Sequence, residues 1–307
     1  MSRFVVRRLA YAVLVMLGVS LLVFGMSRSA GDPRNLYLNE YSSPSSEDWK
    51  IMGEELGLDK PVVVQYALWV GRALKGDMGR SLSQAKNPLT VITERFGATA
   101  QLAGVSFFIT VVVGVPLGVL SAVQRGTILD YLARGFAIFG QAVPPFWLGI
   151  VLVLIFAVNL GWLPTSRRGD WTNLVLPAVT LAWPACAGMV RITRSAMLDV
   201  MDAPFVAMAR AKGVGRSGVI WKHAFRNALI PPLTYATILI ANFIIGAVVV
   251  ETVFAWPGIG RLAAEGAFNN DFPLVAALSI FFAFAFVTSS FVADIAYGLL
   301  DPRVRVS

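Results

Sequence analysis

Charged residues, cysteine and histidine are all scarce in this sequence. Charged residues make up only 14% of the chain against 56% hydrophobic residues, and the mean hydropathy is +0.68. These values exclude a soluble domain of this length. The single cysteine, Cys186, excludes a disulfide framework and a cysteine-based metal site, and its apolar surroundings favour a small core residue. The single histidine, His223, has no second histidine with which to bind a metal.

Motifs for nucleotide binding and catalysis are also missing. No G-x-x-x-x-G-K-[ST] phosphate loop occurs, so the chain does not bind ATP by that route. Residues 213–218 match G-x-G-x-x-G by letter, but they follow a helix-like run, and no acid stands about twenty residues further on, so we reject a dinucleotide site. No pair of intramembrane acids suggests a protease. We therefore expect no catalytic residue, cofactor or metal.

Long apolar runs are abundant instead. Crossing a bilayer takes about 20 apolar residues. Six segments qualify: 9–27, 100–123, 133–158, 174–190, 229–250 and 274–299. The first follows a basic N-terminus and resembles a signal peptide, but no convincing small-residue cleavage site follows it, so we interpret it as a retained anchor. The sequence predicts an all-α polytopic membrane protein with six transmembrane helices.

The distribution of basic residues predicts the orientation. With the N-terminus inside, the inner segments carry fourteen Lys and Arg residues and the two short outer loops carry three. The long segment between the first two spans is also outside, but loops of that length count little. Both termini are therefore expected in the cytoplasm, in the cell (inner or plasma) membrane. The net charge of +8 lies beside apolar spans, which favours anionic headgroups and partner proteins over nucleic acid.

Three regions are expected: an N-terminal transmembrane helix over 1–30, an extracytoplasmic helical cap over 31–99, and a five-helix core over 100–307. Within the cap, 45–48 reads as a capping box, and Trp49, Met52 and Leu56 follow at helical spacing. A second amphipathic helix is expected from Pro61 to Gly76, and a third helix from Asn87-Pro88 into the second span. The cap either packs against the spans or contacts an external partner.

Two features inside the spans predict local geometry. Pro144-Pro145 removes two backbone donors midway through the third span, which should kink it. Gly114 and Gly118 flank Pro116 in a small-xxx-small pattern that permits close helix contact. For both features we favour a packing role over a role in a pathway.

Four residues are candidates for lining a translocation pathway: Gln141, Pro144, Asn242 and Glu251. Each also has an ordinary structural interpretation. A mid-span amide such as Asn242 most often bonds a neighbouring helix, and Glu251 lies near a span end, where snorkelling or backbone contacts suffice.

The segment from Phe205 to Thr234 is basic, amphipathic and unsuited to hydrocarbon. Six side chains within it are basic, and no acid occurs from 203 to 250: Arg210, Lys212, Arg216, Lys222, His223 and Arg226. Each Arg or Lys at the centre of a bilayer costs about 2.5–3.5 kcal/mol on insertion scales. The segment is therefore expected to be a structured loop on the positive side of the membrane, where a partner can bind it.

At these residues the chain resembles the permeases of binding-protein-dependent ABC importers, in the dipeptide, oligopeptide and nickel branch. The resemblance rests on the cytoplasmic loop motif Phe205-Val206, Ala209-Arg210-Ala211-Lys212-Gly213, His223 and Arg226-Asn227-Ala228-Leu229-Ile230-Pro231. Further matches run along nearly the whole chain, among them Pro145-Phe146-Trp147-Leu148-Gly149 and Glu251-Thr252-Val253-Phe254. Ala207 departs from the Glu of the general motif, which this branch often lacks, and Ser290 stands where an Asn is common.

The resemblance implies a fold and a set of partners. Such permeases pair with a second homologous permease subunit, two cytoplasmic ATPase subunits and an external substrate-binding protein. A coupling helix within the loop at about 195–228 docks on the ATPase, and nine residues match its motif: Phe205, Ala209, Arg210, Ala211, Lys212, Gly213, His223, Arg226 and Asn227. The expected substrates are dipeptides or oligopeptides, with nickel complexes or oligosaccharides as alternatives. An ion-coupled secondary transporter is the alternative of another class, although the inverted repeats typical of that class are not evident.

Overall fold

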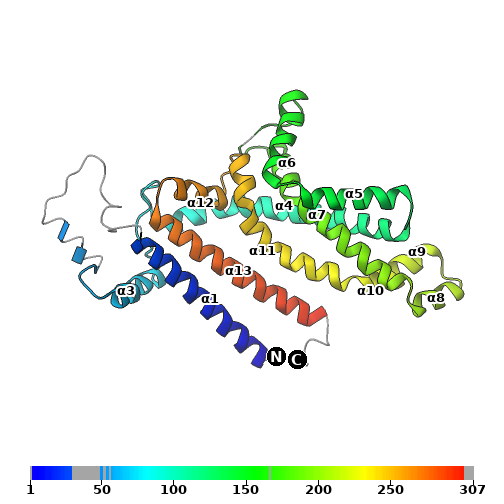
Figure 1. Ribbon diagram of the computed structural model, residues 1–307, viewed down its shortest axis with the longest axis horizontal. Coiled ribbons are helices and arrows are strands. Elements are labelled where there is room, and N and C mark those ends of the chain that lie inside the picture. Colours follow the sequence, from blue (N-terminus) through cyan, green and yellow to red (C-terminus); the bar gives the residue numbers. More distant parts are fainter. Residues whose placement is uncertain (1, 30–48, 51–52, 55–56, 166, 301–307) are drawn as a thin grey trace. The chain divides into compact units, whose positions relative to one another are not determined.

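The structure is a computed structural model that describes residues 2–29, 49–50, 53–54, 57–165 and 167–300 (Figure 1). The predicted capping box at 45–48, together with Met52 and Leu56, lies outside the described residues. The described residues form helices joined by turns, and no strand occurs among them. The prediction of an all-α polytopic membrane protein is confirmed.

Figure 1 labels the helices along the chain. In chain order they are α1 (Ser2–Ser29), α3 (Val62–Leu74), α4 (Pro88–Val123), α5 (Ile128–Ala142), α6 (Pro145–Leu152), the π-helix η2 (Val153–Asn159), α7 (Trp171–Met201), α8 (Pro204–Ala211), α9 (Arg216–Gly218), the π-helix η3 (Val219–Phe225), α10 (Arg226–Ala228), α11 (Ile230–Val253), α12 (Ile259–Phe268) and α13 (Phe272–Leu300).

Five of the six predicted spans correspond to single helices long and apolar enough to cross a membrane: Val6–Ser29, Pro88–Val123, Trp171–Met201, Ile230–Val253 and Phe272–Val292. The remaining predicted segment, 133–158, is two helices that meet at an angle of 109°. Pro144 has an extended backbone (φ −63°, ψ 136°), and Pro145 is the first residue of α6. The predicted break at the two prolines is confirmed, and a bend this sharp makes the pair either one broken span or a re-entrant loop.

The described chain divides into two compact units, which we treat separately. One comprises residues 1–97 and 261–287, and the other comprises residues 98–260 and 288–307. The second unit contains the broken span and the whole basic loop, so it carries the residues on which the functional predictions depend.

In the first unit, α3 packs on α1 through an aromatic cluster. The ring of Phe24 contacts the rings of Tyr66 (centroids 5.4 Å apart) and Trp69 (5.9 Å), and the hydroxyl groups of Ser20 and Tyr66 are hydrogen-bonded at 2.7 Å. Pro61 directly precedes α3, and Gly76 has a positive φ of 83° just beyond its end. The predicted start and end of this amphipathic helix are confirmed.

A buried carboxylate holds a second part of the first unit together. Asp271 is fully buried and accepts hydrogen bonds from the Ser81 hydroxyl (2.5 Å) and from the backbone N–H (2.9 Å) and hydroxyl (2.7 Å) of Ser83. Burial alone raises the pKa of Asp271, but these hydrogen bonds outweigh it, so the pKa lies below its ordinary value. The carboxylate thus fixes the loop before α4 to the turn between α12 and α13.

In the second unit, α7 is the central helix, and α5, α6 and α11 all pack against it. Its core-facing residues are mostly small, and Cys186 lies among them, 3% exposed, as its apolar surroundings predicted. The hydroxyl groups of Ser106 and Thr110 in α4 reach carbonyl oxygens of α7, those of Ala178 (3.2 Å) and Ala182 (3.4 Å). These contacts require α4 and α7 to lie very close together.

The predicted close contact at Gly114 and Gly118 is confirmed. A methyl group at Gly118 would lie 2.6 Å from the Cβ of Thr193 and 2.8 Å from the carbonyl oxygen of Val190, and one at Gly114 would lie 2.8 Å from the side chain of Met189. Because part of this contact is backbone, it cannot be relieved by a rotamer change. The two glycines therefore set the distance between α4 and α7.

We expect Gly118→Ala to destabilise the protein by about 1–3 kcal/mol, because the added methyl group overpacks the contact with α7. Gly104→Ala is the matched control, since a methyl group added at Gly104 on the same helix would meet no atom of another helix within 4 Å. Thermal unfolding of the detergent-solubilised protein checks the difference. Equal unfolding temperatures for the two variants would contradict the packing role.

Candidate functional site

The coupling segment, which we define as residues 204–228, begins directly after α7. Pro204 occupies the first turn of α8, where a missing backbone N–H costs nothing. The helix ends at Ala211, and Gly213 then adopts a φ of +77° while its N–H bonds the carbonyl of Arg210 at 3.0 Å. A side chain would be strained at this backbone angle, so glycine permits the turn after Lys212.

One side of the coupling segment packs onto the helical bundle. Val206 is fully buried and Ala209 is 6% exposed, and they share a hydrophobic cluster with residues of α4 and α7. The full buried set is Val119, Ala122, Ala196, Met197, Val206, Ala209, Val219, Ala224 and Ala228. α8 packs against η3, and both η3 and α10 pack against α7. The segment is therefore fixed to the ends of two long helices rather than loosely attached.

The opposite side of the coupling segment is exposed, apolar and basic. Phe205 is 43% exposed, Met208 59% and Trp221 48%. The same segment carries five exposed basic side chains, and within the described part of the chain none of the five forms an ion pair: Arg210, Lys212, Arg216, Lys222 and Arg226. Exposed aromatic and methionine side chains next to unpaired cations are typical of a surface that binds a partner protein.

The structure separates the nine motif residues into two groups. Phe205, Arg210, Ala211, Lys212, Gly213 and Arg226 are exposed, whereas Ala209 faces the bundle. His223 is half-buried in η3, and its carbonyl accepts a hydrogen bond of 2.6 Å from the side-chain amide of Asn227. Asn227 therefore has a structural contact within the segment, and Ala209 supports α8 from its inner side.

The four pathway candidates lie in different environments. Pro144 and Gln141 are exposed at and just before the break in the third span, and Asn242 is exposed in the middle of α11. Asn242 forms no hydrogen bond within the described residues, so the expected bond to a neighbouring helix is not seen there. Glu251, by contrast, is fully buried.

Glu251 belongs to a packed polar cluster at the end of α11. Its carboxylate accepts a hydrogen bond of 2.5 Å from the hydroxyl of Thr99, and that hydroxyl oxygen accepts one of 2.9 Å from the N–H of Ile259. A side chain at Gly258 would collide with this carboxylate. The carboxylate therefore joins α4 to the turn after α11 and does not snorkel toward water.

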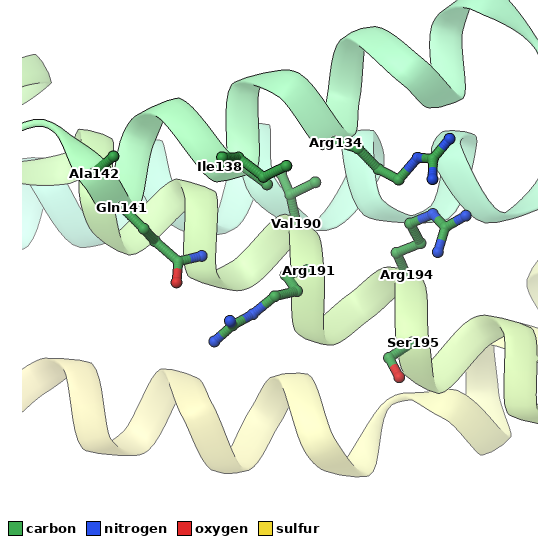
Figure 2. Close-up of a pocket in the computed structure, with 9 residues that line it drawn as sticks. Arg134, Ile138, Gln141, Ala142, Val190, Arg191, Arg194 and Ser195 are labelled. Atoms are coloured by element: carbon green, nitrogen blue, oxygen red, sulfur yellow. The ribbon is translucent and has the colours of Figure 1, made fainter.

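Beside the break in the third span, an open pocket of about 610 Å³ lies between α5 and α7 (Figure 2). Its polar lining consists of an amide, a hydroxyl and three guanidinium groups: Gln141, Ser195, Arg134, Arg191 and Arg194. Ala137, Ile138, Ala142 and Val190 supply the apolar lining.

One end of this pocket is held together by a buried charge cluster that sequence reasoning missed. Asp130 is 1% exposed and accepts two hydrogen bonds from Arg194 (2.8 and 3.1 Å), one from the Ser121 hydroxyl (2.7 Å) and one from the N–H of Gly126 (3.0 Å). The more exposed Arg134 lies 3.7 Å away. The cluster joins α4, the turn after it, α5 and α7. In the sequence, Asp130 is the only acid between Glu94 and Asp170, and this isolation was the signal available.

Family comparisons cover almost the entire chain. Residues 114–306 match the family described as binding-protein-dependent transport system inner membrane component, and residues 1–103 match the corresponding N-terminal membrane component. The coupling segment, the pocket and the charge cluster all lie within the first match.

Three curated relatives align over nearly their full lengths. The chain is 36% identical to the oligopeptide transport system permease protein AppB of Bacillus subtilis, over 99% of this chain and 100% of that protein. It is 38% identical to a putative peptide transport system permease protein of Brucella abortus, over 99% of both chains. It is 33% identical to the glutathione transport system permease protein GsiC of Escherichia coli, again over 99% of both.

A solved structure shares the fold. An inward-facing structure of the MetNI methionine ABC transporter superposes with a TM-score of 0.58 at 20% identity, covering 69% of this chain and 97% of that chain. At this identity the similarity concerns the fold alone.

We expect Arg194→Ala to destabilise the protein by about 3–5 kcal/mol, because it leaves the buried Asp130 carboxylate without its closest cation. Arg134→Ala, which removes the distant and more exposed arginine of the same cluster, is the control and should cost less than about 1 kcal/mol. Denaturant or thermal unfolding in detergent measures both. The double variant Asp130→Ala with Arg194→Ala should recover part of the stability that Arg194→Ala loses. If the loss in the double variant equals the sum of the losses in Asp130→Ala alone and Arg194→Ala alone, the two residues do not interact directly.

Proposed function

The chain belongs to the family of inner-membrane components of binding-protein-dependent transport systems, and from this premise we propose that it is a peptide-importing permease whose coupling segment docks on an ATPase. The proposal rests on the exposed side of α8. It combines Phe205 and Met208 with the unpaired Arg210 and Lys212 on a helix fixed to the bundle.

The packing of the segment explains how force could pass from an ATPase to the membrane. Val206 and Ala209 on the inner side of α8 share one hydrophobic cluster with Val119 of α4 and Met197 of α7. A displacement of α8 therefore displaces the ends of α4 and α7, because close-packed cores transmit strain rather than absorb it. Closure of the ATPase around nucleotide would favour one orientation of these helices and so shift the population between inward- and outward-facing states.

The substrate assignment comes from the relatives. The aligned proteins are named for oligopeptides, peptides and glutathione, each of which contains amide bonds and a free carboxylate. We infer that this chain carries short peptides that an external binding protein delivers. Because the described chain forms a single set of spans, a second permease subunit would supply the other half of the pathway, and two ATPase subunits would bind the pair.

The orientation follows from the coupling segment. An ATPase that uses cellular ATP lies in the cytoplasm, so residues 204–228 face the cytoplasm, and both termini lie on the same side. The segment between α1 and α4, which includes α3, then lies outside, where the binding protein docks. This arrangement agrees with the excess of basic residues in the inner segments.

We expect the double charge reversal Arg210→Glu with Lys212→Glu to weaken ATPase binding by at least about thirtyfold, because a desolvated charge pair at an interface is worth roughly 2–5 kcal/mol. Membrane insertion should remain normal, since both side chains are exposed. Copurification of the ATPase and binding-protein-stimulated ATP hydrolysis measure the effect.

The matched control for this experiment reverses two exposed lysines at the ends of α3, Lys60→Glu with Lys75→Glu, and should leave ATPase copurification intact. The competing explanation for Arg210 and Lys212 is attraction to anionic headgroups, worth about 1 kcal/mol per residue and strongly screened by salt. If the Arg210/Lys212 reversal assembles and transports like wild type, the docking role is wrong.

Single cysteines should report the orientation directly. In a Cys186→Ala background, a cysteine at Lys75 should react with an impermeant thiol reagent on intact cells, and one at Ser217 should react only after the cells are broken, because both positions are exposed but lie on opposite sides of the membrane. Labelling of position 217 from outside would reverse the topology.

A further inference from the structure

Arg191 is an unusual residue for its position. It lies on α7 directly after the predicted span 174–190 and ten residues before Met201, about 15 Å from the end of the helix. Its side chain is exposed, and it forms no hydrogen bond or ion pair within the described residues. A cation in a membrane-spanning helix is costly in contact with lipid, and such residues face the bundle interior or a water-filled cavity.

The Arg191 side chain leans toward the N-terminal end of α7, as side chains on a helix normally do. Figure 2 shows the guanidinium of Arg191 directed away from Ser195, toward the end of the pocket where Gln141 lies. Both polar heads therefore point into the same region of the pocket, deeper in the span.

The charges of this pocket do not balance. Three guanidinium groups line it, and the one acid of the cluster, Asp130, is already bound by Arg194 and lies within 3.7 Å of Arg134. Arg191 is left without an anion in the described structure. A guanidinium donates two parallel hydrogen bonds to a carboxylate, and a neighbouring amide can bond the peptide backbone.

We propose that Arg191 and Gln141 form a contact point on the wall of the pathway that receives the C-terminal carboxylate and the adjacent amide of a passing peptide. The inference rests on the proposed function, since it takes peptides as the substrate. The pocket volume of about 610 Å³ accommodates a short peptide, and its apolar lining, which includes Ile138 and Val190, tolerates varied side chains. The contact binds the C-terminal carboxylate and the adjacent amide, which all peptides share, and does not discriminate between their side chains.

The contact has a second consequence for a transporter. Within the described residues Arg191 has no anionic partner, so a peptide carboxylate would supply one only during passage.

The experiment uses the complete importer, with its second permease, ATPases and binding protein, reconstituted in phosphatidylcholine vesicles. The probes are tri-alanine and its C-terminal amide, each at a concentration that saturates the binding protein. We expect Arg191→Gln to lower the import of tri-alanine per ATP hydrolysed by about tenfold, as expected for loss of a charge-assisted hydrogen bond, while import of the amide changes little. Arg191→Lys should restore part of the loss, and Gln141→Ala should cause a smaller defect.

The control is Arg125→Gln, which removes an exposed arginine in the turn between α4 and α5, outside the pocket, and should import like wild type. Wild-type import by Arg191→Gln, or an equal defect for the acid and the amide, would overturn the inference. Loss of the second permease on purification would overturn it by assigning Arg191 to the subunit interface. A defect seen only when anionic lipid is added would overturn it by assigning Arg191 to lipid headgroups. Failure of the wild-type importer to carry either peptide would instead overturn the peptide assignment itself.

Discussion

Close approach of helices to α7 is the constraint on which the second unit depends. In a membrane the hydrophobic effect does not draw helices together, so van der Waals contact between small residues and interhelical hydrogen bonds must do so. Gly118 faces the backbone of α7, Gly140 of α5 faces Ala187, and Gly188 of α7 faces the hydroxyl of Tyr235 in α11. Three helices are thereby held against one, and the polar contacts that α4 makes with carbonyl oxygens of α7 fit only at that distance.

The same close packing gives the coupling segment its rigidity. Because α8 contributes Val206 and Ala209 to a cluster that also contains residues of α4 and α7, a partner that grips its exposed side acts on the whole bundle. The pair of Asp130 with Arg194 joins α5 to α7, and the same carboxylate binds the turn after α4 through Gly126. Apolar packing and a charge pair thus fix one end of the bundle.

Polar groups within the spans divide into those already satisfied and those exposed. Glu251 and Asp130 are buried and hydrogen-bonded, which is the arrangement that a low-dielectric interior requires. Gln141, Arg191 and Asn242 are exposed on membrane-spanning helices without a bond inside the described chain. Contact of all three with hydrocarbon would be costly, so these residues are expected to face water, substrate or the second subunit.

The sequence alone determined the features that depend on local composition. Apolar length predicted the spans, proline predicted the break at Pro144, and the run of basic residues predicted the exposed loop, since each follows from residues adjacent in the chain. Only the tertiary structure decided which polar groups meet across helices. The pairing of Asp130 with Arg194, the inward position of Ala209, the burial of Glu251 and the shared pocket of Gln141 and Arg191 depend on the rotation and register of packed helices. In α4 and α11, which are nearly uniformly apolar, no local pattern specifies that rotation, and in α5 and α7 the sequence does not show which helix each polar face will meet.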